Sequence, residues 1–182
     1  MNQQYIIQTP RLGLRKWQES DLPLLCEMNK DALVMKYFPN FLTELESEQM
    51  FNRINAHFVS YNFGFYAVDL LEANSFIGFI GLGHPRFEAY FTPCVEIGWR
   101  ILSQFWNKGY ATEGALACLD FAFSVLKIPE IYSFTSVLNL PSENVMKKID
   151  MTKLGTFEHP NLDEGHNLRT HVIYKKTNPF QI

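Results

Sequence analysis

The residues best suited to chemistry lie in one short run, residues 106–113, which follows a strand-like segment at residues 95–101. The run has the composition of a turn that leads into a helix, with Gly109 where the helix begins. A helix N-terminus presents unpaired backbone N–H groups and the positive end of the helix dipole, so it binds anions such as phosphate. Gly109 would let a phosphate approach the backbone, and Ala111 keeps the next turn clear. The same spacing fits an ordinary strand-to-helix turn, and the run alone leaves both interpretations open.

Hydrophobic periodicity predicts the elements that must position this run. Alternation and short apolar runs between turn residues indicate strands, which are expected at residues 9–17, 63–71, 76–83, 94–101, 131–137, 152–157 and 170–176. Apolar residues three or four positions apart indicate helices, which are expected after residues 20–21, from residue 44 to about 57, over 112–126 and from residue 141. The order of elements alone predicts a single α+β domain over residues 1–182.

Helix-start signals refine these predictions. Ser20 or Asp21 is expected to cap the first helix, with Pro23 in its first turn. Residues 43–46 form a capping-box pattern before the second helix. Glu113, near the start of the third helix, is expected to face away from the core.

Composition excludes several classes of function. The chain has 182 residues, and its 16 basic and 19 acidic residues give a net charge of −3, so a broad nucleic-acid-binding surface is not expected. Its three cysteines form no C-x-x-C pair and fit a reducing cytoplasm. No segment approaches the roughly 20 apolar residues of a membrane span, and the first residues lack a signal-peptide pattern. The histidines have no metal-ligand spacing, so no metal site is expected.

Several motifs resemble those of the GNAT superfamily of acyl-CoA-dependent N-acyltransferases. Residues 106–111 are similar to its Q/R-x-x-G-x-G/A pyrophosphate loop, with Trp106 in place of Gln or Arg. The run E-I-G-W-R followed by W-N-K-G-Y-A-T-E, and the opening T-P-R-L-G-L-R, resemble the ribosomal-protein N-terminal acetyltransferase (RimJ/RimL-like) branch, although Asn107 stands where that branch usually has Gly. The resemblance covers nearly the whole chain. It implies a mixed, mostly antiparallel seven-stranded sheet with helices on both faces, whose fourth and fifth strands splay apart.

The resemblance also implies which residues bind acetyl-CoA as co-substrate. Backbone groups of Trp99, Arg100 and Ile101 would pair with the amides of the pantetheine arm. Backbone N–H groups of the loop would hold the pyrophosphate, and these belong to Asn107, Lys108, Gly109, Tyr110, Ala111 and Thr112.

The catalytic assignments follow from the same resemblance. Asn139 would bond the pantetheine and Ser142 would lie near the thioester sulfur, although both residue types are also favoured helix caps. Glu96 is the candidate general base, and the alternative is an ordinary strand carboxylate that is paired or solvated. His171 or water is the next candidate for the base.

Together these features predict an acetyl-CoA-dependent N-acetyltransferase without a metal, in which a primary amine attacks the thioester directly in a ternary complex. A protein N-terminus is the first acceptor class considered, and a small-molecule amine (amino acid, polyamine or aminoglycoside) is the alternative. A non-catalytic acyl-CoA-binding sensor is the third interpretation. A cytoplasmic monomer or homodimer without nucleic-acid or membrane partners is expected.

Overall fold

The computed structural model describes residues 5–180, and every structural statement below concerns these residues. The helices are α1 (Leu22–Lys30), α2 (Glu44–Tyr61), α3 (Tyr110–Ser124) and α4 (Leu140–Lys148), with short 3-10 turns η1 (Glu19–Asp21), η2 (Val34–Tyr37) and η3 (Ser103–Phe105). The strands are β1 (Ile7–Gln8), β2 (Leu12–Arg15), β3 (Phe65–Leu70), β4 (Ser75–Gly83), β5 (Glu96–Ile101), β6 (Glu130–Ser136), β7 (Thr152–Glu158) and β8 (Thr170–Thr177). They form one sheet of order β1-β2-β3-β4-β5-β6-β8-β7.

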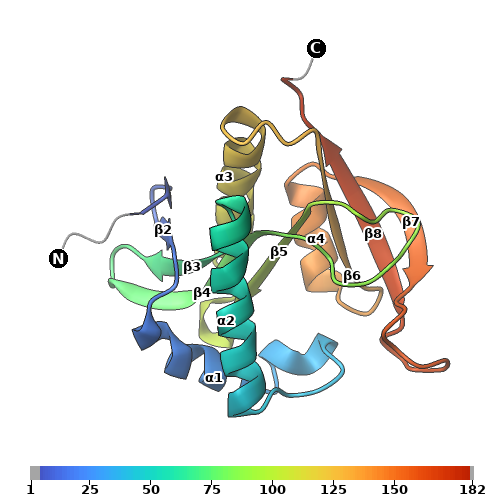
Figure 1. Ribbon diagram of the computed structural model, residues 1–182, viewed down its shortest axis with the longest axis horizontal. Helices are drawn as coiled ribbons and strands as arrows, with labels where there is room; N and C mark the ends of the chain where they lie inside the picture. The colour runs from blue at the N-terminus through green and yellow to red at the C-terminus, as the bar shows by residue number, and fades with distance from the viewer. Residues whose placement is uncertain (1–4, 181–182) are drawn as a thin grey trace.

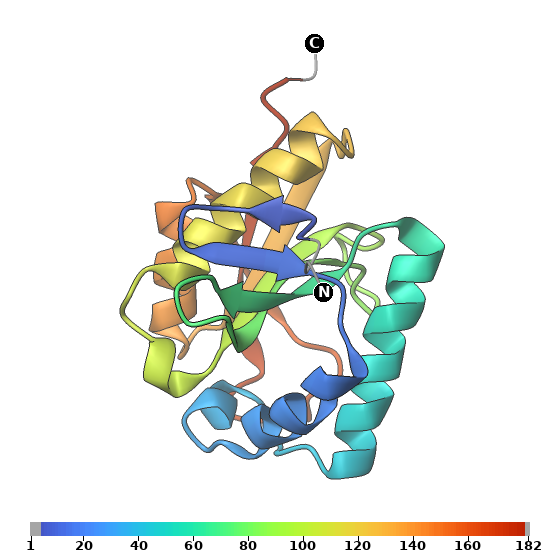
Figure 2. The ribbon, with the colours of Figure 1, turned by 90° about the vertical axis from the view of Figure 1, so that its left-hand side faces the viewer.

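Helices cover both faces of this sheet (Figure 1). Seen edge-on, α3 and α4 lie on one side of the sheet and α2 lies on the other (Figure 2). Among the strand pairs, only β5 and β6 run parallel, and all the others are antiparallel. The predicted α+β class, with a mixed and mostly antiparallel sheet, is therefore confirmed.

The sheet has eight strands rather than the seven expected, because the chain turns back before β2. The Thr9 N–H donates to the Leu12 carbonyl at 2.9 Å, and the Thr9 hydroxyl accepts the Leu12 N–H at 2.9 Å. This turn pairs Ile7 with Leu14 and creates the two-residue strand β1. The strand expected over residues 9–17 is therefore shortened to β2.

The predicted helices are present with shifted ends. The capping box of α2 forms as expected, since the Glu46 N–H donates to the Thr43 hydroxyl at 3.2 Å and the Thr43 N–H donates to the Glu46 carboxylate at 2.8 Å. This helix continues to Tyr61, beyond the expected end near residue 57, and stops at Asn62, whose φ is 60°. The third helix begins at Tyr110 and ends at Ser124, each two residues earlier than expected.

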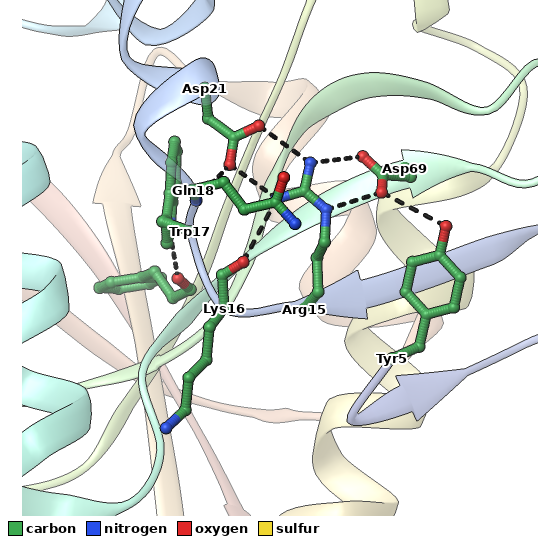
Figure 3. A network of polar contacts seen from close by, with 8 residues as sticks. Tyr5, Arg15, Lys16, Trp17, Gln18, Asp21 and Asp69 are labelled. Carbon is green, nitrogen blue, oxygen red and sulfur yellow. Dashed lines mark hydrogen bonds and ion pairs between the residues drawn. The ribbon is translucent and has the colours of Figure 1, made fainter. Parts of the chain in front are cut away.

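Asp21, predicted as a possible cap of α1, binds an arginine instead of capping the helix. Asp21 occupies the N-cap position without a side-chain capping bond, and its carboxylate instead binds Arg15 at 2.6 and 2.9 Å. Asp69 of β3 holds the other side of the same guanidinium at 2.8 and 3.0 Å (Figure 3). Burial alone would lower the pKa of Arg15, but the hydrogen bonds and charges of both carboxylates raise it above its ordinary value. The three side chains join β2, β3 and the start of α1.

Close packing fixes the position of α3 against the sheet. A Cβ atom at Gly114 would lie 2.4 Å from Cδ1 of Ile80 on β4, so a larger residue there would require the Ile80 side chain to shift. The inward face of α3 is buried as predicted by its periodicity, through Ala115, Leu119 and Ala122. The N-terminus of α3 is thereby held at the end of β5.

Candidate functional site

The two parallel strands at the centre of the sheet separate almost immediately. Glu96 and Tyr132 are the only register pair between β5 and β6, and the Tyr132 N–H donates to the Val95 carbonyl at 2.9 Å. One residue on, the Ser133 hydroxyl, rather than a backbone N–H, donates to the Ile97 carbonyl at 2.9 Å. The strands are therefore splayed beyond Glu96, as the resemblance implies.

Alternation along β5 decides which backbone groups face the gap between the strands. In a strand, successive residues direct their backbone polar groups to opposite edges. The Val95 carbonyl faces β6, whereas the Leu102 N–H donates to the Ile77 carbonyl of β4 at 2.9 Å. Trp99 and Ile101 therefore turn their backbone groups towards the gap, and Arg100 turns its own towards β4. The Ile101 carbonyl is occupied by the indole N–H of Trp106 at 2.7 Å.

The loop that follows has the shape that its sequence predicts. Asn107 has a φ of 60° and Gly109 a φ of 82°, and α3 begins directly after Gly109. Asparagine is among the side chains that tolerate positive φ best, so Asn107 can stand where the related branch has glycine. The first bond of the helix runs from the Glu113 N–H to the Gly109 carbonyl. The N–H groups of residues 110–112 precede it and have no helical partner.

Cationic side chains lie beside this loop. Arg11 donates through Nη1 to the Lys108 carbonyl at 2.9 Å, and its guanidinium lies 4.6 Å from the centre of the Tyr110 ring. Nη2 of Arg11 is also the nearest atom, at 3.5 Å, to a Cβ placed on Gly109. Glu113 holds Arg11 in place through its carboxylate. Sequence reasoning missed Arg11 because it comes from the distant β1–β2 turn. Fixed N–H groups, a glycine without a side chain and the nearby guanidinium of Arg11 fit a bound pyrophosphate.

Asn139 and Ser142, the two site residues predicted at the start of α4, make different contacts. Asn139 is the N-cap, since its side-chain oxygen accepts the Ser142 N–H at 3.3 Å, and its amide NH₂ donates to Thr135 at 3.0 Å. Both ends of the Asn139 amide thus have protein partners. The hydroxyl of Ser142 has no hydrogen-bond partner in the described part of the chain and is partly exposed. Ser142 is therefore not the cap of this helix.

Glu96 lies where β5 and β6 separate. It opposes Gly83 of β4, and the Phe65 ring covers this glycine: a Cβ there would lie 2.8 Å from Cε2 of Phe65 and 3.5 Å from Oε1 of Glu96. Within residues 5–180 the carboxylate has no hydrogen bond and no ion pair. Burial raises the pKa of Glu96 to about 7. A carboxylate with such a pKa is half ionised near neutral pH, which suits a general base.

An aromatic cluster lies on the same side of the sheet as Glu96. Phe87 and Phe91, from the segment between β4 and β5, pack on Phe134 of β6 with ring centres 5.4 and 5.9 Å apart. His171 of β8 borders this cluster, and its Nδ1 lies 3.0 Å from the Arg169 carbonyl. Burial lowers the pKa of His171 below its usual value. Sequence reasoning found His171 but missed the two phenylalanines.

Two further observations concern residues 5–180. In this part of the chain, no helix has both the length and the apolar character needed to cross a bilayer. It also contains no group of three or more His, Cys, Asp or Glu side chains placed to hold a metal ion.

Comparison with known proteins gives a consistent result. Residues 11–152 match the acetyltransferase (GNAT) domain family. The chain is 33% identical over 154 residues to the uncharacterised N-acetyltransferase YnaD of Bacillus subtilis, covering 84% of this chain and 85% of YnaD. A GNAT-family acetyltransferase structure from Bacillus anthracis has a TM-score of 0.77 and 29% identity, covering 94% of this chain and 98% of that one.

A more distant structure shares the fold and contains a ligand. Spermidine N-acetyltransferase from Vibrio cholerae, in complex with CoA and spermine, has a TM-score of 0.73 and 19% identity, covering 93% of this chain and 97% of that one. The family match spans most of the present sequence, including the loop at residues 106–112. The chain therefore belongs to the GNAT family of acetyltransferases, and it is an acyltransferase that uses acetyl-CoA as its co-substrate.

Proposed function

We propose that this protein transfers the acetyl group of acetyl-CoA to a primary amine by direct attack in a ternary complex, with Glu96 as general base. The observation that carries this proposal is the unpaired carboxylate of Glu96 at the point where β5 leaves β6. Its pKa of about 7 allows the carboxylate to take a proton from an ammonium group at neutral pH.

In the proposed complex, acetyl-CoA is bound by the loop before α3 and by the open edge of β5. The N–H groups of residues 107–112 and the positive end of α3 would hold the pyrophosphate. The backbone groups of Trp99 and Ile101 that face the gap would pair with the pantetheine amides as a neighbouring strand does. The N–H groups available on β5 would also polarise the thioester carbonyl.

Glu96 and Ser142 both take part in the proposed chemical step. Glu96 accepts a proton from the protonated amine, and the neutral nitrogen attacks the thioester carbon. A C–N bond forms, the C–S bond breaks, and the CoA thiolate leaves. Ser142, whose hydroxyl has no protein partner, relays a proton from solvent to the departing sulfur, giving up its own proton while it takes another from water. Glu96 returns its proton to solvent, so both side chains are restored. The nitrogen releases its remaining extra proton to solvent, and the products are an amide and free CoA.

Two classes of acceptor agree with this chemistry. The similarity of residues 96–113 to the RimJ/RimL-like branch favours a protein N-terminus. A small-molecule amine is favoured by a separate observation, the buried Nε of Arg100, which has no hydrogen-bond partner within residues 5–180.

The direct test is release of CoA thiol from acetyl-CoA in the presence of a panel of small amines and peptides with free N-termini. The proposal expects amine-dependent thiol release together with the acetylated amine, identified by mass spectrometry. Tight binding of acetyl-CoA without any turnover would instead indicate an acyl-CoA sensor.

A further inference from the structure

Arg100 is a largely enclosed cation without an anionic partner. It occupies the same face of β5 as Glu96, because residues an even number of positions apart in a strand point to one side. Its guanidinium lies 4.0 Å from the ring centre of Phe38 and 5.3 Å from that of Phe79. The Nε atom is buried and has no hydrogen-bond partner within residues 5–180.

The guanidinium is held by a neutral group. Nη1 of Arg100 donates to the Asn29 side-chain oxygen at 2.5 Å. Asn29 is fully buried on α1 and is itself fixed by a 3.0 Å bond to the hydroxyl of Ser47 on α2. The two aromatic rings and the amide therefore set the plane of the guanidinium and leave its Nε–Nη2 edge without a protein acceptor.

Arg15, which is more deeply buried than Arg100, has two anionic partners. Arg15 is enclosed by the carboxylates of Asp21 and Asp69 (Figure 3). For Arg100, no acidic group of the described residues forms an ion pair, and the carboxylate of Asp31 is bound to the Ser103 hydroxyl at 2.8 Å. The Nε of Arg100 is a buried donor without a partner, which is costly and calls for an explanation.

We infer that Arg100 binds a carboxylate of the acceptor, so that the acceptor is a small molecule carrying both a primary amine and a carboxylate, such as an amino acid. This inference rests on the proposed amine acetylation. The Nε–Nη2 edge is a fork of two N–H donors that matches a planar carboxylate.

The Phe65 ring covers the strand between the two side chains. Glu96 and Arg100 are four residues apart, which places their Cα atoms about 13 Å from one another. Between them lies Gly98, which has no side chain, and a Cβ there would meet the Phe65 ring at 3.2 Å. The acceptor would lie against the Phe65 ring, with its amine directed to Glu96 and its carboxylate to Arg100.

The test compares acceptors that differ only in the carboxylate. Each α-amino acid is paired with its carboxamide and its decarboxylated amine, for example tyrosine with tyrosinamide and tyramine. The longer acceptors 4-aminobutyrate and 6-aminohexanoate are paired with butylamine and hexylamine. Peptides with free N-termini are included. The kcat/KM for thiol release is measured for the parent, Arg100→Met, Arg100→Lys and, as a matched surface control, Arg53→Met. Melting temperatures identify any variant that does not fold.

We expect the parent to prefer at least one carboxylate-bearing acceptor over its neutral partner by about 10- to 100-fold, as a charge-assisted bidentate bond provides. This ratio should fall towards one in Arg100→Met, be intermediate in Arg100→Lys and stay unchanged in Arg53→Met. Both acceptors of a pair are measured with the same variant, so any effect of the substitution on cofactor binding cancels from the ratio of their kcat/KM values.

Three results would overturn the inference while leaving the proposed function intact. They are equal turnover of charged and neutral partners, an undiminished preference in both Arg100 variants, and turnover of peptide N-termini alone. Absence of turnover with every amine, despite binding of acetyl-CoA, would instead reject the proposed function.

Discussion

Glu113 and Arg11, which are 102 residues apart in the sequence, are joined at the start of α3 by two hydrogen bonds. One carboxylate oxygen of Glu113 accepts from Nε of Arg11 at 2.6 Å, and the other accepts from the Arg11 backbone N–H at 3.1 Å. Because Arg11 also donates to the Lys108 carbonyl, this pair ties the β1–β2 turn to the loop before α3. The guanidinium is thereby held beside the anion-binding N–H groups.

The first prediction concerns the glycine of this loop. Gly109→Glu should abolish binding of acetyl-CoA, because it places a side chain and a negative charge where the pyrophosphate approaches the backbone. Isothermal titration calorimetry measures the loss. Gly165→Glu is the matched control: Gly165 also has positive φ (84°) and no neighbour within 4 Å of an added Cβ, so it introduces the same strain away from the loop. Parent-like affinity in Gly109→Glu would place the anion site elsewhere.

Replacing the proposed base should affect turnover more than cofactor binding. For Glu96→Gln we expect kcat to fall by about 10²- to 10⁴-fold, the usual contribution of a general base, with little change in the affinity for acetyl-CoA. Steady-state kinetics and calorimetry on one preparation separate the two effects. Glu72→Gln, in the exposed β3–β4 turn, removes a carboxylate as a control. A rate within about threefold of the parent would transfer the role to His171 or water.

The pH dependence of the rate should report the same carboxylate. Glu96 must be ionised to accept a proton, and burial raises its pKa to about 7. We therefore expect kcat/KM of the parent to increase with pH through an inflection near 7, and this inflection to be absent from the residual activity of Glu96→Gln. An unchanged profile in the variant would show that another group titrates.

The contribution of Glu96 to stability should decrease with increasing pH, whereas kcat/KM should increase. The folded state raises the pKa of Glu96 from 4.5 to about 7, so between these values it retains a proton that the unfolded chain has released. The contribution of Glu96 to stability therefore decreases as pH rises across this window. Glu96→Gln does not titrate, so its melting temperature relative to the parent should be higher at pH 8 than at pH 4. Equal differences at both pH values would contradict burial of an unpaired carboxylate.

Asn139 and Ser142 can be distinguished by comparing stability with rate. Asn139→Ala removes the cap of α4 and should cost about 1 kcal/mol of stability. Ser142→Ala removes a hydroxyl without a protein partner, so its melting curve should stay close to that of the parent while turnover falls. Ser142→Thr, which keeps a hydroxyl donor, should retain more activity than Ser142→Ala. A Ser142→Ala enzyme with the parental rate would leave water as the proton donor.

Local signals in the sequence predicted the elements and the loop, but contacts between distant segments could not be predicted. The capping box at Thr43 and the helix start at Gly109 depend on neighbouring residues, and both are present. The partners of Arg15 and Arg100 depend on how the sheet and α1 pack, since Asp69 and Asn29 are 54 and 71 residues away from them. The sequence identifies these side chains as charged or polar without indicating which of them meet.

The splay between β5 and β6 also bears on solubility. An outer strand with unpaired backbone groups can recruit strands of other chains and seed aggregation. Here the open edge of β5 lies in the middle of an eight-stranded sheet, with β6 as its neighbour on that side. A second protein cannot easily lay a strand in a space flanked by the chain's own sheet, whereas a slender extended molecule can enter. The fold thus keeps a strand edge available for recognition while shielding it from intermolecular β-pairing.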